Sequence, residues 1–283
     1  MSKSPVIGEL ESILAQEPVD EVFITLSRDK YGHLVEMIVR LCEEQGILVR
    51  LQSALFELRS TRWHVEELDG MPIVTIWSGP PDGWPFLVKR LIDICGSAAL
   101  LLALIPLFAL VAVLIKLDSP GPVFFRQERI GLSKRRFRLF KFRTMIEGAE
   151  KQQQMLEHLN ESDGPVFKIK DDPRITRVGK FLRRFSIDEL PQFLNVLKGE
   201  MSLVGPRPLP VRDIERINVP WHKRRLSVKP GMTCLWQVNG RSNIGFDDWV
   251  RMDLEYIDKW SLALDMKILL KTIPVVLRGR GAY

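Results

Sequence analysis

The longest apolar stretch of the chain, residues 91–117, contains only two charged residues, Asp93 and Lys116. As a single helix it would be about 40 Å long at about 1.5 Å per residue, which exceeds the roughly 30 Å hydrocarbon core of a bilayer. A proline, Pro106, lies in the middle of the stretch and removes one backbone hydrogen bond. The pattern therefore predicts a helix that is broken near Ile105-Pro106.

Basic residues flank this stretch on both sides. Lys89 and Arg90 precede it, and Lys116 and a basic run follow it. Because positive charges favour the cytoplasmic side of a membrane, both ends are expected on that side. We therefore expect a re-entrant membrane helix over residues 84–118, with Lys89, Arg90 and Pro106 at the membrane. A helix that spans the bilayer and a buried core helix of a soluble protein are the alternatives.

Residues 1–83 have shorter apolar runs that are typical of a small α/β domain. A strand, an amphipathic helix and two more strands in this order predict a parallel sheet. The segment contains no GxGxxG motif, so nothing in it indicates a dinucleotide site. The Gly- and Pro-rich segment 78–85 marks a domain boundary. The predicted elements are strands 19–26, 47–51 and 72–77 and helix 31–45.

Residues 119–283 are expected to form a separate, mostly helical domain. The alternation at 137–142 (FRLFKF) fits a strand, or an interfacial segment with its aromatic rings in lipid. The last two helical patterns are amphipathic, which suits helices at a membrane interface. Helices are predicted at 146–159, 176–185, 187–197, 210–217, 246–260 and 262–277, and a short strand at 233–238.

The net charge of +6 conceals an asymmetry, because residues 1–70 hold 13 acidic and 7 basic side chains. The densest basic run, residues 126–143, has eight Lys or Arg against Glu128 alone. Such a run suits the phosphates of a nucleotide, a nucleic acid or anionic lipid, or it is a solvated face. The three cysteines are far apart, and the N-terminus lacks a signal-peptide core. Both features favour a reducing cytosol without a disulfide framework or a zinc site.

Two adjacent carboxylates, Asp188 and Glu189, stand where a basic segment gives way to an apolar helical pattern. Ser186 and Glu189 have the spacing of a capping box, which is a purely structural interpretation. A chemical interpretation is also open. An ionised aspartate can attack phosphorus and form an acyl-phosphate. A neighbouring glutamate can help to hold Mg²⁺ that is shared with substrate phosphates.

Several cations nearby in the sequence are candidates for binding those phosphates. Arg207 stands out because Pro206 and Pro208 stiffen the backbone on both sides of it. Asp265 lies between two apolar runs and is either a helix-surface residue or the partner of one of the arginines. The other candidate phosphate-binding residues are Lys141, Arg143, Arg183 and Arg184.

A series of short motifs follows residue 89 in order. Among them are Lys141-Phe-Arg-Thr-Met145, Ser186-Ile-Asp-Glu-Leu-Pro-Gln192, Gly205-Pro-Arg-Pro208, Lys229-Pro-Gly231 and Gln237-Val-Asn-Gly-Arg241. In these motifs the chain closely resembles the monotopic phosphoglycosyl transferases. These are bacterial sugar transferases, of the polyprenyl-phosphate hexose-1-phosphate transferase type, that start exopolysaccharide and O-antigen repeat units.

The resemblance implies a function. Members of this family transfer a sugar phosphate from a UDP-sugar to undecaprenyl phosphate, release UMP and use Mg²⁺. By motif, Asp188 is similar to the nucleophile that forms a covalent phosphosugar enzyme, and Glu189 resembles its partner in the acidic dyad; both are the expected ligands of Mg²⁺. Lys141, Arg183, Arg207 and Asp265 fall on positions around the active site. The implied location is the cytoplasmic face of the bacterial inner membrane, with its lipid as a partner. We expect no nucleic-acid partner, and a homo-oligomer is compatible with the sequence.

The chain also departs from the family pattern. Cys234 stands where many relatives have glycine, and Ile105 where some have serine. Longer members carry a bundle of spanning helices and a full nucleotide-binding-like fold, of which residues 1–83 resemble only the second half. The chain is therefore either an intermediate-length member or a truncated one, and glucose or galactose is the expected sugar. Two alternatives are a catalytically silent membrane scaffold for polysaccharide assembly, in which the acidic pair only caps a helix, and a nucleic-acid-binding protein.

Overall fold

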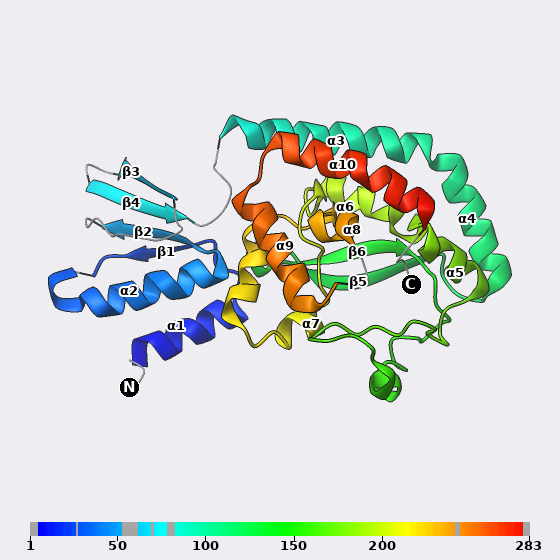
Figure 1. Ribbon diagram of the computed structural model, residues 1–283, viewed down its shortest axis with the longest axis horizontal. Coiled ribbons are helices and arrows are strands. Elements are labelled where there is room, and N and C mark those ends of the chain that lie inside the picture. Colours follow the sequence, from blue (N-terminus) through cyan, green and yellow to red (C-terminus); the bar gives the residue numbers. More distant parts are fainter. Residues whose placement is uncertain are drawn as a thin grey trace.

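The computed structural model of the protein describes residues 5–26, 28–52, 62–68, 71–77, 83–240 and 244–279. Figure 1 shows a small α/β part at one end and a larger, mostly helical part beside it. The two parts meet where helix α2 (Arg28–Gln45) packs against the 3-10 helix η4 (Pro220–Ser227). Gly46, which follows α2, has a φ of +70°, and a Cβ there would lie 2.4 Å from the Ser227 Cβ. The contact between the parts is therefore close.

The small part is a four-stranded sheet in the order β1-β2-β4-β3. Only β1 and β2 are parallel, whereas β4 is antiparallel to both of its neighbours, so the predicted all-parallel sheet is wrong. The reason is β3, which the sequence analysis missed: a short connection from β3 to β4 makes the pair antiparallel. Most of the linker 78–85 lies outside the described residues. The elements are α1 (Pro5–Gln16), β1 (Glu21–Ile24), α2, β2 (Leu48–Gln52), β3 (Arg62–Leu68) and β4 (Met71–Trp77).

The long apolar stretch forms two helices, α3 (Trp84–Ala103) and α4 (Ile105–Asp118). They meet at Leu104 with a bend of 60°, which confirms the predicted break. Pro106 is at the start of α4, where a missing N–H costs no intrahelical hydrogen bond. In the described part of the chain no single helix is long and apolar enough to cross a membrane, although this bent pair passes the same test of length and composition.

Much of the apolar surface of this helix pair faces outward. Eleven of its large apolar side chains are exposed, including Leu87 and Leu117, which is not the pattern of a core helix. The opposite face of α3 docks on the larger part, where the rings of Phe86 and Trp260 stack at 4.4 Å. Farther along α3, the buried carboxylate of Asp93 accepts a hydrogen bond from the Leu203 backbone. Helix α3 is thus held firmly on one side and presents an apolar surface on the other.

The larger part contains two small sheets. Strands β5 (Phe124–Ile130) and β6 (Arg136–Phe142) form an antiparallel hairpin, which confirms the strand predicted at 137–142. Strands β7 (Ser202–Val204) and β8 (Gly231–Thr233) are parallel. A Cβ on Gly205, which follows β7, would lie 2.5 Å from the Lys229 carbonyl oxygen, so only glycine allows this approach.

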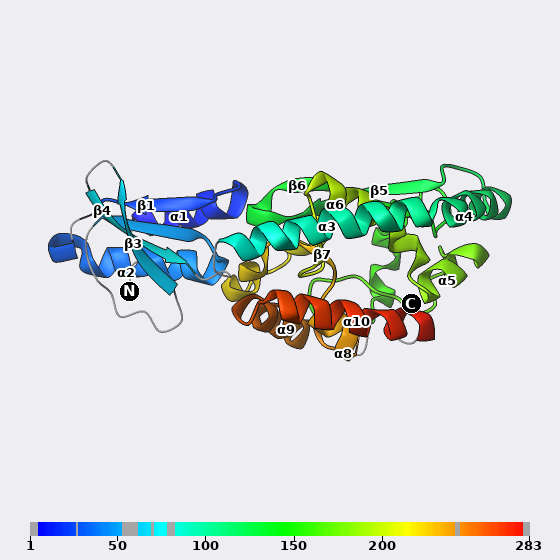
Figure 2. The same ribbon diagram turned by 90° about the horizontal axis from the view of Figure 1, so that it is seen from above.

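Helices surround these sheets (Figures 1 and 2). The predictions for 176–185, 246–260 and 262–277 are confirmed, and 210–217 contains only a short helix. The α-helices are α5 (Arg177–Arg184), α6 (Phe193–Lys198), α7 (Val211–Glu215), α8 (Leu235–Asn239), α9 (Phe246–Asp258) and α10 (Leu262–Arg278). The 3-10 helices are η1 (Leu132–Lys134), η2 (Gln154–Leu159), η3 (Ile187–Gln192) and η4.

Three of the predicted elements differ from the structure. The predicted helix 146–159 is a series of turns that ends in η2, because Gly148 has a φ of +76° and the backbone bonds run from residue i to i−3, as from the Ala149 N–H to the Ile146 carbonyl. The predicted helix 187–197 is divided into η3 and α6. The predicted strand 233–238 ends at Thr233, opposite the last residue of β7, and α8 follows it.

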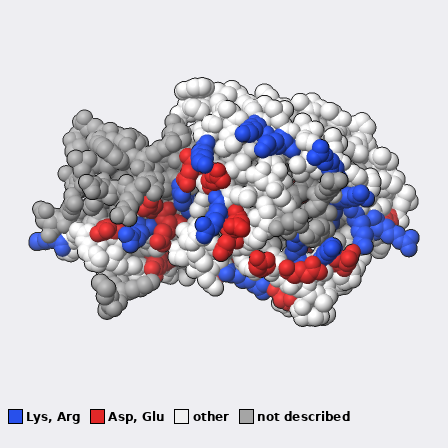
Figure 3. Space-filling view, in the orientation of Figure 1, with Lys and Arg blue, Asp and Glu red and all other residues white. Residues whose placement is uncertain are grey.

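Figure 3 shows how charge is distributed over one face of the molecule. Lys and Arg side chains form a row over α10, and the surface above that row, along α3, carries almost no charge. Helix α10 also exposes an apolar stripe formed by Met266, Leu270, Ile273 and Leu277. Because α3 and α10 lie along the same side of the larger part, their exposed apolar surfaces belong to one region (Figure 1).

Candidate active site

The acidic pair lies on η3, directly after the basic helix α5. Ser186 connects the two with a left-handed backbone (φ 55°, ψ 23°), and its side chain makes no capping hydrogen bond. The predicted capping box is therefore wrong: Glu189 approaches Ser186 only through the backbone, where its N–H donates to the Ser186 carbonyl at 3.2 Å. The left-handed turn instead points the Glu189 carboxylate toward cations from other elements.

Glu189 is held by two cations that are distant in the sequence. Lys141 of β6 donates to Oε1 at 2.9 Å. The Arg207 guanidinium bonds both carboxylate oxygens, donating to Oε2 at 3.1 Å through Nη1 and to Oε1 through Nη2. Burial opposes ionisation of Glu189, but the charges of Arg207 and Lys141 outweigh it and hold the pKa of Glu189 well below its usual range. Glu189 is thus a fixed carboxylate with little freedom to move.

Asp188 is buried too, with 7% of its surface exposed, but it is held differently. The nearest cation is Lys141, whose Nζ lies 3.9 Å from Oδ2. In the part of the chain that the structure describes, no side chain donates a hydrogen bond to Asp188. Burial raises the pKa of Asp188; the charge of Lys141 opposes this shift, and the charge of Glu189 adds to it. Asp188 is therefore the less constrained and more basic member of the pair.

Two more arginines complete the cluster. Arg183 donates through Nε to the Thr144 hydroxyl at 3.0 Å, and its charge acts on Asp188. Arg129 of β5 lies close enough to Arg207 that the two charges interact, and burial together with Arg207 lowers the pKa of Arg129 to about 10. We did not predict Arg129 as a site residue. The register of the hairpin places Arg129 on the same face as Lys141. Phe125 is opposite Lys141, and Arg129 is on the same face as Phe125.

Comparisons with known proteins show the family of this chain. The family described as "Bacterial sugar transferase" matches residues 84–279, which include every residue of the cluster. The chain belongs to the bacterial sugar transferase family. It is 41% identical over 202 residues to the "Exopolysaccharide production protein ExoY" of Sinorhizobium fredii, covering 69% of this chain and 88% of that one.

Two longer relatives have names that describe transfer reactions. The "Galactosyl transferase CpsE" of Streptococcus agalactiae is 41% identical over 278 residues, or 96% of this chain. The "UDP-glucose:undecaprenyl-phosphate glucose-1-phosphate transferase" of Escherichia coli is 36% identical over 260 residues, or 89% of this chain. This sugar transferase spans 61% of the streptococcal relative and 53% of the Escherichia coli relative.

Two residues predicted to bind substrate lie outside the cluster of this sugar transferase. Arg143 is buried, and its guanidinium donates to the carbonyls of Ser119 and Pro120, so it fixes the turn after α4. Arg184 is exposed on α5 and lies 5.7 Å from the Phe185 ring centre. The structure places neither residue against the acidic pair.

Asp265 and Lys89 of this sugar transferase form a buried pair of their own. Their charged groups are 2.6 Å apart. The other oxygen of Asp265 accepts from the Tyr256 hydroxyl at 2.8 Å, and the Trp260 indole N–H lies 3.3 Å from Oδ2. Asp265 is thus the partner of a lysine and not of an arginine. Arg90 also faces inward, donating to the carbonyls at the end of α6. In this arrangement Lys89 and Arg90 are engaged by protein and not by a headgroup.

The acidic pair supplies only two carboxylates, so a Mg²⁺ ion bound there would also take ligands from water and from the substrate. Over the described residues no group of three or more His, Cys, Asp or Glu side chains could hold a metal. Mg²⁺ commonly takes one or two carboxylates and completes its shell with water and substrate phosphates. Asp188 has open lone pairs, and Glu189 already accepts three hydrogen bonds. Asp188, assisted by Glu189, fits this mode.

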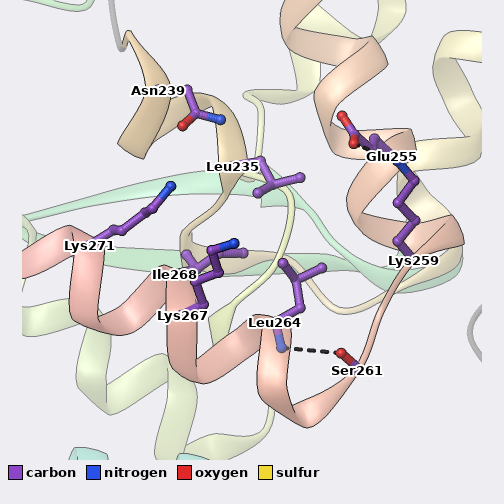
Figure 4. Close-up of a pocket in the computed structure, with 9 residues that line it drawn as sticks. All are labelled: Leu235, Asn239, Glu255, Lys259, Ser261, Leu264, Lys267, Ile268 and Lys271. Atoms are coloured by element: carbon purple, nitrogen blue, oxygen red, sulfur yellow. Dashed lines mark hydrogen bonds and ion pairs between the residues drawn. The ribbon is translucent and has the colours of Figure 1, made fainter.

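A cavity of about 410 Å³ lies elsewhere in this sugar transferase, between α8, α9 and α10. Figure 4 shows Lys267 and Lys271 on one side of it and the Glu255–Lys259 pair on another. None of the residues that line it belongs to the acidic pair or its cations. The predicted chemistry therefore depends on the buried cluster and not on this cavity.

Proposed function

We propose that this protein transfers a sugar-1-phosphate from a UDP-sugar to undecaprenyl phosphate, with UMP as the leaving group. The names of the relatives support this substrate pair. Family membership supports the reaction class, and the name of one relative supports a role in exopolysaccharide production. UDP-glucose and UDP-galactose are the two donors that these names support.

The proposal rests on one observation: the two carboxylates differ in their hydrogen-bond partners. Glu189 is fixed by Lys141 and Arg207, whereas Asp188 lies beside them without a hydrogen-bond donor among the described side chains. A nucleophile needs a free lone pair and neighbouring charges that stabilise the transition state. Asp188 meets both requirements, whereas the oxygens of Glu189 are already engaged by Lys141 and Arg207.

The charge of the cluster also suits a diphosphate ester. Four cationic side chains surround two carboxylates, which leaves two positive charges for the two negative charges of a UDP-sugar. Arginine forks bind phosphate oxygens in a bidentate manner, and lysine supplies a point charge. The four cations are Arg129, Lys141, Arg183 and Arg207.

The reaction we propose has two displacements at one phosphorus atom. A carboxylate oxygen of Asp188 attacks the sugar-bearing phosphorus of the UDP-sugar, and the bond from that phosphorus to the bridging oxygen breaks, so that UMP leaves with the electron pair. An oxygen of undecaprenyl phosphate then attacks the same phosphorus, and the Asp188 carboxylate is released. Mg²⁺, when bound, would neutralise the charge of the diphosphate. Lys141 and Arg183 would stabilise the charge that develops on the phosphoryl oxygens.

We further propose that α3 and α4 enter the cytoplasmic leaflet of the inner membrane as a re-entrant element. The exposed apolar surfaces of α3, α4 and α10 support this placement, since a patch of this extent is costly in water. A lipid phosphate acceptor would then remain in the membrane during the reaction. Lys89 and Arg90 would fix α3 to the catalytic part and not bind headgroups.

The test is release of UMP by purified protein supplied with undecaprenyl phosphate, Mg²⁺ and a panel of UDP-sugars. We expect release with one or two donors and no release by Asp188→Asn. The matched control is Asp171→Asn, the same substitution at an exposed acid whose one ion pair among the described residues is with Lys180. Release by Asp188→Asn at the wild-type rate would refute the mechanism. Lack of release by the wild type with every donor would support a silent scaffold instead.

A further inference from the structure

A second buried ion pair lies behind the active site and has no part in the proposed chemistry. Arg225 of η4 and Asp253 of α9 are 2.6 Å apart, and their side chains are 1% and 0% exposed. The Arg225 guanidinium also lies 5.1 Å from the Trp249 ring centre. Taking two charges out of water is costly, and an apolar pair of similar volume often stabilises a protein equally well. Stability alone therefore does not explain this pair.

The second contact of Arg225 suggests what the pair does. Its Nη2 atom, which binds Asp253, also donates to the backbone carbonyl of Arg207 at 2.9 Å. Arg207 is the residue whose side chain binds both oxygens of Glu189. The next carbonyl, that of Pro208, accepts from Arg129 at 3.1 Å. The backbone that bears Arg207 is therefore held from two sides by buried cations.

We propose that Arg225, oriented by Asp253, is a positioning residue that places the Arg207 guanidinium on Glu189. A guanidinium is planar and rigid, so a carboxylate that fixes one edge also fixes the direction of its other N–H groups. The close contact of Gly205 with residues 229–231 fixes the other end of the same turn. The effect on sugar transfer rests on the proposed function, but the geometry can be tested without turnover.

The informative perturbation replaces both members of the pair by apolar residues, Arg225→Met with Asp253→Leu. This variant leaves no uncompensated buried charge and so keeps the fold, but it removes the donor to the Arg207 carbonyl. We expect a ten- to hundredfold loss of kcat for UMP release, since a misplacement of about 1 Å can cost about a hundredfold. The control is Arg224→Met, one residue earlier, whose guanidinium pairs with the exposed Asp258.

A double-mutant cycle with Arg207→Met separates positioning from a structural role. If Arg225 acts through Arg207, the paired substitution costs less than about twofold once Arg207 is absent. Arg225→Lys, which retains a charged donor, should recover at least half of the lost rate on a logarithmic scale. A full additional loss in the Arg207→Met background, or no loss in the wild-type background, would overturn the proposal.

The same double-mutant cycle can be measured through the affinity for UDP in the presence of Mg²⁺, which requires no turnover. We expect the paired substitution and Arg207→Met each to weaken UDP binding by about ten- to hundredfold. The two changes combined should weaken binding no more than either change alone. If the wild type binds UDP but releases no UMP, the proposed function fails while this cycle still decides the positioning role. If the paired variant binds UDP like the wild type, Arg225 does not position Arg207.

Discussion

Asp265 provides a test that separates a structural residue from a substrate-binding one. Sequence resemblance puts Asp265 around the active site, whereas the structure engages it with Lys89, Tyr256 and Trp260. Replacing it by leucine would leave the Lys89 ammonium buried without its counter-charge, because only 13% of that side chain is exposed. The Trp260 indole would lose an acceptor as well, but the Tyr256 hydroxyl still has the Val204 carbonyl at 3.1 Å.

The expected cost follows from these contacts. Breaking a buried ion pair by removing one member destabilises a protein by about 3–5 kcal/mol. Replacing both members, with Lys89→Met and Asp265→Leu, removes the stranded charge and should recover about half of that cost or more. The free energy of unfolding would be measured in detergent by denaturant titration for the wild type, both single variants and the double variant.

Activity completes this test. If Asp265 is structural, Asp265→Asn should retain most of the UMP release per folded molecule, measured below the temperature at which the variant unfolds. The reasoning is refuted if Asp265→Leu is as stable as the wild type, or if the double variant is as unstable as the sum of the two single ones. A large loss of activity in a fully folded Asp265→Asn protein would indicate that Asp265 binds substrate.

Four other predictions follow from the structure. The charge of Lys141 lowers the pKa of Asp188, so Lys141→Met should shift the acidic limb of the pH–rate profile for UMP release to higher pH. Activity should fall as the pH drops through that limb, because protonated Asp188 cannot attack phosphorus. Chelation of Mg²⁺ should abolish release without lowering the melting temperature, since the described residues contain no all-protein metal site. Gly46→Val should weaken the contact of α2 with η4, seen as faster proteolysis between the two parts, because a Cβ would clash with Ser227. Asp93→Leu should lower the unfolding free energy by about 1–3 kcal/mol by leaving the buried Leu203 N–H and Ser202 hydroxyl unpaired.

The sequence predicted those elements whose pattern is local and strong. The break near Pro106, the strand at 137–142 and the two amphipathic helices after residue 246 all come from runs of side chains with one clear period or one proline. Strand β3 was missed because the alternation of polar and apolar residues in its sequence, RWHVEEL, covers only residues 62–66 and breaks at Glu67. The segment 146–159 has a helical pattern, but its backbone forms turns with bonds from residue i to i−3, and Gly148 has a φ of +76°. The apolar pattern does not distinguish such turns from an α-helix.

The sequence likewise predicted some residues of the candidate site and missed others. The family resemblance brought together Asp188, Glu189, Lys141 and Arg207, which the structure joins by direct contact. It could not reveal the partner of Asp265, because Lys89 is 176 residues away in the sequence. Arg129 was missed because its position depends on strand register.

The most direct test of the central claim is the mass of the protein after incubation with Mg²⁺ and its UDP-sugar in the absence of undecaprenyl phosphate. The account predicts UMP release that stops after about one turnover, and a covalent sugar phosphate on the peptide that contains Asp188. The adduct should disappear when undecaprenyl phosphate is added and should never form on Asp188→Asn. Steady UMP release that requires the lipid phosphate from the first turnover, with no adduct at any time, would contradict the account.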